Sequence, residues 1–180
     1  MYAFKVAGAA AMKSLPLEGV AAAARHALDS IRSMGVALSP CIVPEAGKPT
    51  FSIGDDEIEI GMGIHGEPGI EVRKMMTADE IVDVVLARLT AELNLAAGDE
   101  VSVMVNGLGA TPLEELLIVY RGIHRRLAAA GVAVFMPHIG EFATSMEMAG
   151  LSITLFKLDA VNKEYLAAPA STPFYTNSNK

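Results

Sequence analysis

One short segment of the 180-residue chain gathers the residue types that could carry out chemistry. It runs Gly61-Met-Gly-Ile-His-Gly-Glu-Pro-Gly69, so four glycines and a proline surround one histidine, His65. Glycine lets the backbone approach a ligand closely and adopt dihedral angles that other residues avoid. The unperturbed pKa of imidazole is ~6.5, so near neutral pH much of it is the free base. The free base can act as a metal ligand, a general base or a nucleophile.

Spacing alone leaves the role of His65 open. The segment lacks the G-x-G-x-x-G order of a dinucleotide site, because His65 and Gly66 interrupt it, and no P-loop lysine follows. No second histidine or carboxylate pair stands at metal-ligand spacing. Glu67 is the neighbour best suited to orient the His65 ring. A hydrogen-bonded turn histidine without further function fits the pattern equally well.

Helical periodicity predicts the elements that surround this segment. Apolar residues at helical spacing follow Pro16, and Gly35 is expected to end that helix. Thr77-Ala-Asp-Glu80 is a capping box, in which the threonine and the glutamate satisfy each other's backbone donors. A second capping box, Thr111-Pro-Leu-Glu114, opens another helix, which Gly131 ends.

The last of these helices carries several polar candidates on or beside its apolar stripe. The stripe expected to be buried consists of Leu113, Leu116, Leu117, Tyr120 and Leu127. His124 falls on it, so a partly buried, hydrogen-bonded histidine is favoured over a ligand. Arg121 and Arg125 lie one helical turn apart. They either bind a phosphate or a partner, or they only complement the helix dipole.

Strands alternate with these helices. Five segments have the composition or the alternation of strands: 36–39, 57–62, 100–105, 132–136 and 151–158. The histidine segment therefore forms a turn directly after a strand. The pattern predicts one α/β domain over residues 1–167, followed by a loosely held tail over residues 168–180.

Three further residues have simple structural explanations. His26 lies opposite the apolar stripe of its helix and is expected to be solvated. His138 ends a strand beside Gly140 and could line a cleft, although a structural role is favoured. Cys41 stands in a proline-rich loop with nothing basic adjoining it, which disfavours a reactive thiol.

Composition excludes several classes of protein. Hydrophobic residues make up 52% of the chain and charged residues 19%, which argues against disorder. The formal net charge of −7 disfavours nucleic acid and anionic membranes as partners. A single cysteine excludes an intramolecular disulfide and a multi-cysteine zinc site. No leader and no apolar run of ~18 residues is evident, which predicts a cytoplasmic location.

The sequence resembles the dihydroxyacetone kinases, in particular the carboxy-terminal half of their substrate-binding subunit or domain. The stretch Asp56–Ile70, which contains His65, carries the most specific likeness. Other blocks follow in the order of the family: Ser33–Pro44, Gly47–Phe51, Val105–Glu115 and Thr144–Ser152. The resemblance therefore extends over nearly the whole chain.

The resemblance implies a role for His65. In that family the histidine of this motif bonds to the carbonyl carbon of dihydroxyacetone and forms a hemiaminal. Gly63, Gly66 and Glu67, which stand beside His65 in the sequence, are expected to be substrate-binding residues. Such a bond suits a small, uncharged, hydrated triose, because it selects a ketone over glycerol and fixes the terminal hydroxyl for phosphorylation.

The family also implies a fold and partners. We expect a two-layer α/β domain with a mixed sheet of five to six strands and helices mainly on one face. The amino-terminal half of the family's substrate-binding domain supplies the aspartate and histidine thought to activate the hydroxyl. ATP or ADP with magnesium binds a separate domain or subunit, so this chain is expected to bind no cofactor and to be inactive alone. A homodimer is the family precedent.

Two alternatives stay open. Relatives that have lost part of the kinase apparatus can act as ligand-sensing partners of transcriptional regulators, and a chain that keeps His65 fits this role too. The apolar, helix-prone segment after Met1 is also typical of a fragment of a longer chain.

Overall fold

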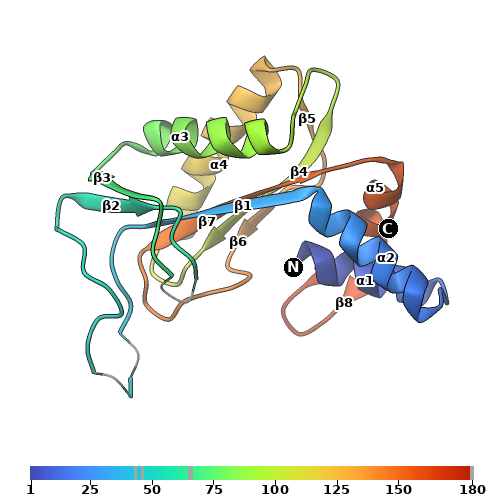
Figure 1. Ribbon diagram of the computed structural model, residues 1–180, viewed down its shortest axis with the longest axis horizontal. Coiled ribbons are helices and arrows are strands. Elements are labelled where there is room, and N and C mark those ends of the chain that lie inside the picture. The colour runs from blue at the N-terminus through green and yellow to red at the C-terminus, as the bar shows by residue number, and fades with distance from the viewer. Residues whose placement is uncertain (43, 46, 65–66, 179–180) are drawn as a thin grey trace.

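A computed structural model describes residues 1–42, 44–45, 47–64 and 67–178 of the protein (Figure 1). His65 and Gly66 lie outside the described residues. The helices are α1 (Tyr2–Met12), α2 (Leu17–Asp29), α3 (Ala78–Glu92), α4 (Leu113–Ala129) and α5 (Ala160–Ala167). The strands are β1 (Ile31–Ala37), β2 (Glu57–Ile60), β3 (Glu71–Lys74), β4 (Glu100–Gly107), β5 (Ala133–Val134), β6 (His138–Gly140), β7 (Gly150–Lys157), β8 (Ala170–Ser171) and β9 (Thr176–Asn177).

The main sheet is mixed, as predicted. Its strands follow the order β3-β2-β1-β7-β4-β5, and β6 pairs with β4 beyond the end of β5. β5 and β6 run parallel to β4, whereas the other pairs are antiparallel. β7 lies at the centre and pairs along its whole length with β1 and β4. Leu151, Ile153 and Leu155 of β7 face the main core, whereas Ser152 and Thr154 alternate with them on the other face, as the sequence predicted.

The helices divide between the two faces of the sheet (Figure 1). One face carries α3 and α4, which pack on the β4 side chains of Val101, Val103 and Val105. The opposite face carries α1 and α5, which pack on Met104 and Phe156. The α/β class and the mixed sheet are therefore confirmed, but part of the sheet is covered on both sides, because α1 residues also bury Met104 and Phe156 on the second face.

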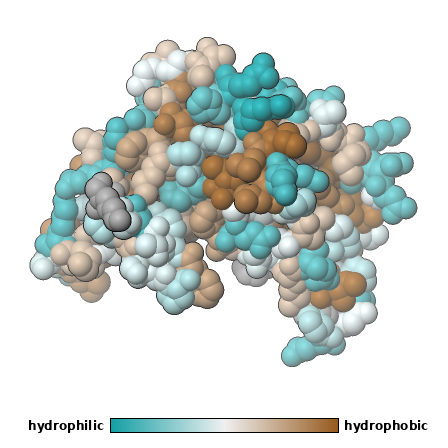
Figure 2. Space-filling view, turned by 180° about the vertical axis from the view of Figure 1, so that it is seen from behind, coloured by the Kyte–Doolittle hydropathy of each residue, from teal (hydrophilic) through white to brown (hydrophobic). Residues whose placement is uncertain are grey.

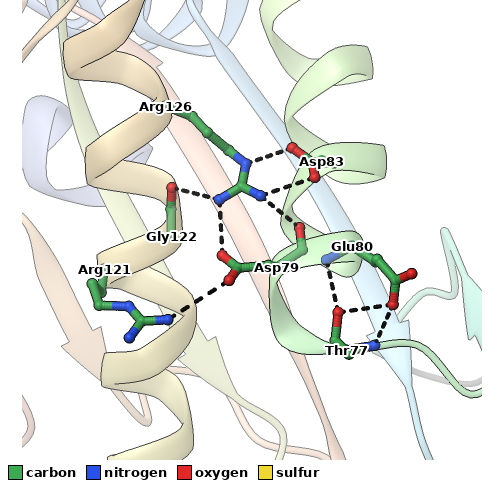
Figure 3. Close-up of polar contacts among 7 residues, drawn as sticks. All are labelled: Thr77, Asp79, Glu80, Asp83, Arg121, Gly122 and Arg126. Atoms are coloured by element: carbon green, nitrogen blue, oxygen red, sulfur yellow. Dashed lines mark hydrogen bonds and ion pairs between the residues drawn. The ribbon is translucent and has the colours of Figure 1, made fainter.

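An ion-pair cluster joins α3 to α4 (Figure 3). The capping box at Thr77 and Glu80 is confirmed and opens α3. From α4, the Arg126 guanidinium donates to Asp83 Oδ2 at 2.9 Å and to Asp79 Oδ1 at 2.9 Å. The two carboxylates raise the pKa of Arg126 above its ordinary value. Arg126 thus links α4 to two carboxylates of α3.

Two predicted boundaries are wrong. α2 ends at Asp29, and Gly35 lies within β1 instead of ending a helix. Pairing of the entire segment Ile31–Ala37 with β7 outweighs its helical periodicity.

The second capping box does not form, because Thr111 Oγ1 bonds to the backbone N and O of Gly150 at 2.8 and 2.7 Å. β3 was not predicted.

The face that α4 buries also differs from the prediction. Leu113 and Leu117 are 53% and 47% exposed, and His124 is exposed as well. The buried residues are Leu116, Val119, Gly122, Ile123 and Leu127. Figure 2 shows hydrophobic side chains gathered on the surface over α4, next to polar ones. The helix is turned toward α3 by the contacts around Gly122, whose position leaves little room for a side chain beside Asp79.

The end of the chain forms a hairpin. β8 and β9 pair with each other, and Asn177 Nδ2 donates to the carbonyl oxygens of Ala167 and Ala168 at 3.2 and 3.1 Å. Residues 168–178, expected to be a loose tail, are thereby attached to the end of α5.

Within the described residues, no helix combines the length and apolar character needed to cross a membrane. The cytoplasmic location stays a prediction.

A matched pair of isoleucines tests the orientation of α4. Ile123 is fully buried and Ile118 is 46% exposed. We expect Ile123→Ala to lower the free energy of unfolding by about 2–5 kcal/mol, because it leaves a cavity in the core. Ile118→Ala should change it by less than about 1 kcal/mol. Urea denaturation measures both, and equal effects would show that α4 is misoriented.

Candidate functional site

The segment Gly61–Gly69 is a loop whose two ends are joined by backbone hydrogen bonds. Gly61 N donates to Gly35 O at 2.7 Å, which continues the pairing of β1 with β2. Ile70 N donates to Ile60 O at 2.7 Å and brings the chain back. Within the loop, Gly63 N donates to Glu67 O at 3.1 Å. His65 and Gly66 belong to this loop by sequence, but both predicted site residues lie outside the described part.

Close contacts accompany two glycines, one of β1 and one of the loop: Gly35 meets a backbone atom and Gly63 meets a side chain. A Cβ atom at Gly35 would lie 2.2 Å from the carbonyl oxygen of Met62, so no side chain fits there. A Cβ atom at Gly63 would lie 2.1 Å from Glu67 Oε2. The structure thus brings together Gly63 and Glu67, two of the predicted site residues. Contact of Glu67 with the His65 ring stays a prediction.

A small apolar cluster supports the loop. Met62 is buried with Ala37, Cys41, Leu108 and Met148, and Phe51 and Ile64 pack against them. This apolar cluster lies on the face of the sheet opposite to α3 and α4. Val36 belongs to the main core under these helices, and the next residue of the strand, Ala37, points to the other face. Residues from the end of β1 and the loop after it, from the segment Gly61–Gly69, from the loop after β4 and from the loop before β7 therefore meet here. We call these residues the loop cluster.

The loop after β4 and the loop before β7 are held to each other. The buried Asn106 side chain donates to Ala143 O at 2.8 Å and accepts from the N–H groups of Phe142 and Ala143 at 2.7 and 2.9 Å. At Gly109, φ is +131° and a Cβ atom would lie 1.8 Å from Met146 O. Sequence reasoning assigned no role to Asn106. An asparagine that ends a buried strand before two glycines was the available signal.

Cys41 is buried at the floor of this loop cluster. Its Sγ lies 3.5 Å from the hydroxyls of Thr50 and Ser145. The next residue ties the same loop to the loop before β7, because Ile42 N donates to Glu147 Oε1 at 2.6 Å. Cys41 is therefore part of the packing.

His138 has a structural position at the far end of the same face. Its Nε2 lies 3.0 Å from the Tyr175 hydroxyl and its Nδ1 lies 3.3 Å from the Tyr2 hydroxyl. Burial, and then the positive charge of Lys5, lower the pKa of His138 to about 4. The neutral His138 ring, on β6, contacts Tyr2 of α1 and Tyr175 of the C-terminal hairpin. It lies away from the loop cluster.

The remaining candidates lie away from the loop cluster. His26 is half-exposed and its Nε2 lies 2.5 Å from Asp159 Oδ2, which ties α2 to the start of α5. Arg121 lies 3.7 Å from Asp79 at the edge of the α3–α4 cluster (Figure 3), and Arg125 is exposed. The described parts of the chain contain no group of three or more His, Cys, Asp or Glu side chains arranged to hold a metal ion.

Fold and loops together define an α/β domain that presents a glycine-rich loop on one face of a mixed sheet. The chain belongs to the Dak1 domain family, whose model matches residues 1–174. This family agrees with the resemblance of the sequence to dihydroxyacetone kinases.

Two relatives of the chain are subunits or members of kinases that act on small ketoses, according to their names. The chain is 45% identical over 172 residues to the dihydroxyacetone-binding subunit DhaK of the PTS-dependent dihydroxyacetone kinase 2 of Listeria innocua. That match covers 96% of this chain and 52% of the relative. The chain is also 40% identical over 176 residues to the L-erythrulose kinase of Pectobacterium atrosepticum, with coverage of 96% and 30%. It therefore spans about half the length, or less, of these relatives.

A solved structure has the same fold. The dihydroxyacetone kinase operon co-activator Dha-DhaQ superposes with a TM-score of 0.86 at 33% identity, over 93% of this chain and 52% of that one.

A single methyl group tests how Gly35 positions the loop. We expect Gly35→Ala to push Met62 outward and to destabilise the protein by about 1–3 kcal/mol, as overpacking does. Backbone amide exchange in residues 61–70 should become faster. Gly8→Ala is the matched control, since its Cβ meets no atom within 4 Å and alanine favours a helix. Unchanged exchange and stability in Gly35→Ala would contradict this role.

Proposed function

We propose that this chain binds dihydroxyacetone, or a close small ketose such as erythrulose, as a hemiaminal on His65, for phosphorylation by a dihydroxyacetone kinase. The observation that carries the proposal is the 45% identity to a dihydroxyacetone-binding subunit across 96% of the chain. The erythrulose kinase among the relatives supports the wider substrate class.

The proposed bond is a reversible addition. A nitrogen of the neutral His65 imidazole attacks the carbonyl carbon, and the carbon–oxygen π bond breaks. The oxygen takes up a proton while the ring loses its N–H proton, so the product is a neutral hemiaminal. No oxidant or other co-reactant is needed. Glycerol has no carbonyl group and cannot form this bond, which provides selectivity without a large contact area.

Features of the described loop support an anchoring role. Gly63 and Glu67 lie together at the base of the segment that contains His65, and Met62 holds the loop on the sheet. In the proposal, the Glu67 carboxylate accepts a hydrogen bond from one ring nitrogen of His65 and orients the other toward the ketone. Gly63 and Gly66 leave room for the ketose beside the backbone.

Phosphoryl transfer would need parts outside this chain. We propose that the other half of the substrate-binding domain supplies the groups that activate the hydroxyl. A separate domain or subunit would bind ATP or ADP with magnesium, or the chain would serve a phosphoenolpyruvate-dependent system. The chain alone would then capture the ketose without turnover, and it would associate as a homodimer.

Ligand selectivity tests the anchoring role of His65. Isothermal titration should show binding of dihydroxyacetone and no binding of glycerol. His65→Ala should weaken dihydroxyacetone binding by roughly a hundredfold, about 3 kcal/mol, because the covalent contribution is lost. His124→Ala removes an exposed histidine on α4 and should bind as the unaltered chain does. Equal affinity for glycerol, or full binding by His65→Ala, would contradict the proposal.

A ligand-sensing role is the second candidate. The observation that favours it is the TM-score of 0.86 with a co-activator of a dihydroxyacetone kinase operon. A sensor would capture the ketose but would not support its phosphorylation. We expect dihydroxyacetone phosphate to form when the other half and the nucleotide-binding or phosphoenolpyruvate-dependent components are added. Capture on His65 without phosphorylation in this complete mixture would favour the sensor.

A further inference from the structure

The two halves of the loop that contains His65 are held by different groups. Met62, in the first half, crosses β1 at Gly35 and packs in the loop cluster. In the second half, Gly69 N donates to Glu59 Oε1 at 2.5 Å. Glu59 belongs to β2, the second strand from one edge of the main sheet (Figure 1). A side chain of the sheet thus joins the end of the loop to a regular strand.

The alternation of β2 places Glu59 on the same face of the sheet as the loop cluster. Ile58 and Ile60 are fully buried in the main core with residues of α3 and α4. Successive side chains of a strand point to opposite faces, so Glu57 and Glu59 lie on the face opposite to these helices. The loop cluster lies on that face too. Glu59 therefore reaches Gly69 without crossing the sheet.

The backbone at Gly69 lies directly against Glu59 and β2. A Cβ atom at Gly69 would lie 2.7 Å from Glu59 Cγ and 2.7 Å from the carbonyl oxygen of Ile60. The next residue, Ile70, returns to the strand by donating from its N to Ile60 O at 2.7 Å. The hydrogen bond from Gly69 to Glu59 is therefore one part of a close contact between the loop and the strand.

The chain between Gly69 and Glu67 is stiff. It consists of Pro68, whose ring fixes its own φ angle. A proline also restricts the residue before it, here Glu67, to extended conformations. The position of Gly69 therefore limits where Glu67 lies, and Glu67 O accepts from Gly63 N at 3.1 Å. A group that holds Gly69 thus also holds the part of the loop that returns from His65.

The acceptor on Glu59 suits this task. Hydrogen bonds from a backbone N–H to a carboxylate are shorter and stronger than those to a neutral acceptor. The Glu59 side chain is half-buried beside the loop, so water screens the contact less than it would at a fully exposed position. A glutamine at this position would offer an amide oxygen as a weaker acceptor of nearly the same shape.

We propose that Glu59 is a positioning residue of the ketose site. Its carboxylate holds the returning half of the loop, so that Glu67 and His65 keep the arrangement in which the ketose is captured. Glu59 acts only through the loop backbone and does not touch the ketose. This inference rests on the proposed function, because it concerns the same site.

The same strand provides a matched control. Glu57 points to the same face of β2 as Glu59, and its Oε2 accepts from Gly54 N at 3.0 Å. Gly54 belongs to the loop before β2, which does not contain His65. Glu57→Ala therefore removes the same kind of contact from a different loop.

Ketose affinity and amide exchange, measured on the same variants, test this proposal. We expect Glu59→Ala to weaken dihydroxyacetone binding by roughly tenfold, as the loss of a hydrogen bond to a charged acceptor does, and to speed amide exchange at Gly69. Glu59→Gln keeps an acceptor oxygen and should recover most of the affinity. Glu57→Ala should bind dihydroxyacetone as the unaltered chain does. Urea denaturation should give similar midpoints for the two alanine variants, so that weaker binding is not a loss of folding.

Three binding results would each overturn the proposal. These are full affinity in Glu59→Ala, equal weakening by Glu57→Ala, and a Glu59→Gln variant that binds as weakly as Glu59→Ala. Amide exchange is measured without the ketose, and unchanged exchange at Gly69 in Glu59→Ala would also overturn it. Absence of dihydroxyacetone binding by the unaltered chain, with faster exchange at Gly69 in Glu59→Ala, would contradict the proposed function instead, so the two failures are distinguished.

Discussion

The close approach of Met62 to Gly35 is the constraint on which the loop cluster depends. The backbone of the loop crosses β1 at a position where any side chain would collide with a carbonyl oxygen. This contact places Met62 in the small apolar cluster with Ala37 and Met148, beneath the segment that contains His65. The geometry of β1 is in turn fixed by its continuous pairing with the central strand β7. The orientation of the loop is thus linked to the core of the sheet.

Buried polar groups complete the support of this cluster. Thr111 bonds to both backbone groups of Gly150, where β7 begins, and Asn106 satisfies three backbone groups of the preceding turn. Neither side chain is free to meet a ligand, because each is fully used by the fold. These bonds substitute for the regular pairing that the loops lack, since a buried unpaired polar group would destabilise the protein. These hydrogen bonds therefore hold the loops on either side of β4 and β7 to each other.

The sequence predicted elements better than it predicted their orientation. Strong local signals, such as the capping box at Thr77 and the apolar run before Asn106, identified α3 and β4 correctly. Long-range contacts decided the rest. Pairing with β7 made a strand of Ile31–Ala37, and packing around Gly122 turned Leu117 to the solvent. Gly63 and Glu67, both predicted to bind the substrate, lie together, but their contact with a substrate stays a prediction. The role of Asn106 required contacts 37 residues away along the chain.

The proposed covalent anchor would give a defined task to a chain that spans about half the length of the relatives it matches. The bond to His65 would select and hold the ketose, and groups from elsewhere would act on its hydroxyl. Carbon-13 NMR of dihydroxyacetone labelled at the carbonyl carbon, mixed with the chain and the complementary half, tests this claim most directly. We predict a protein-bound resonance of a tetrahedral carbon that disappears in His65→Ala. A label that stays in the signals of free dihydroxyacetone, or a bound signal that persists in His65→Ala, would contradict the account.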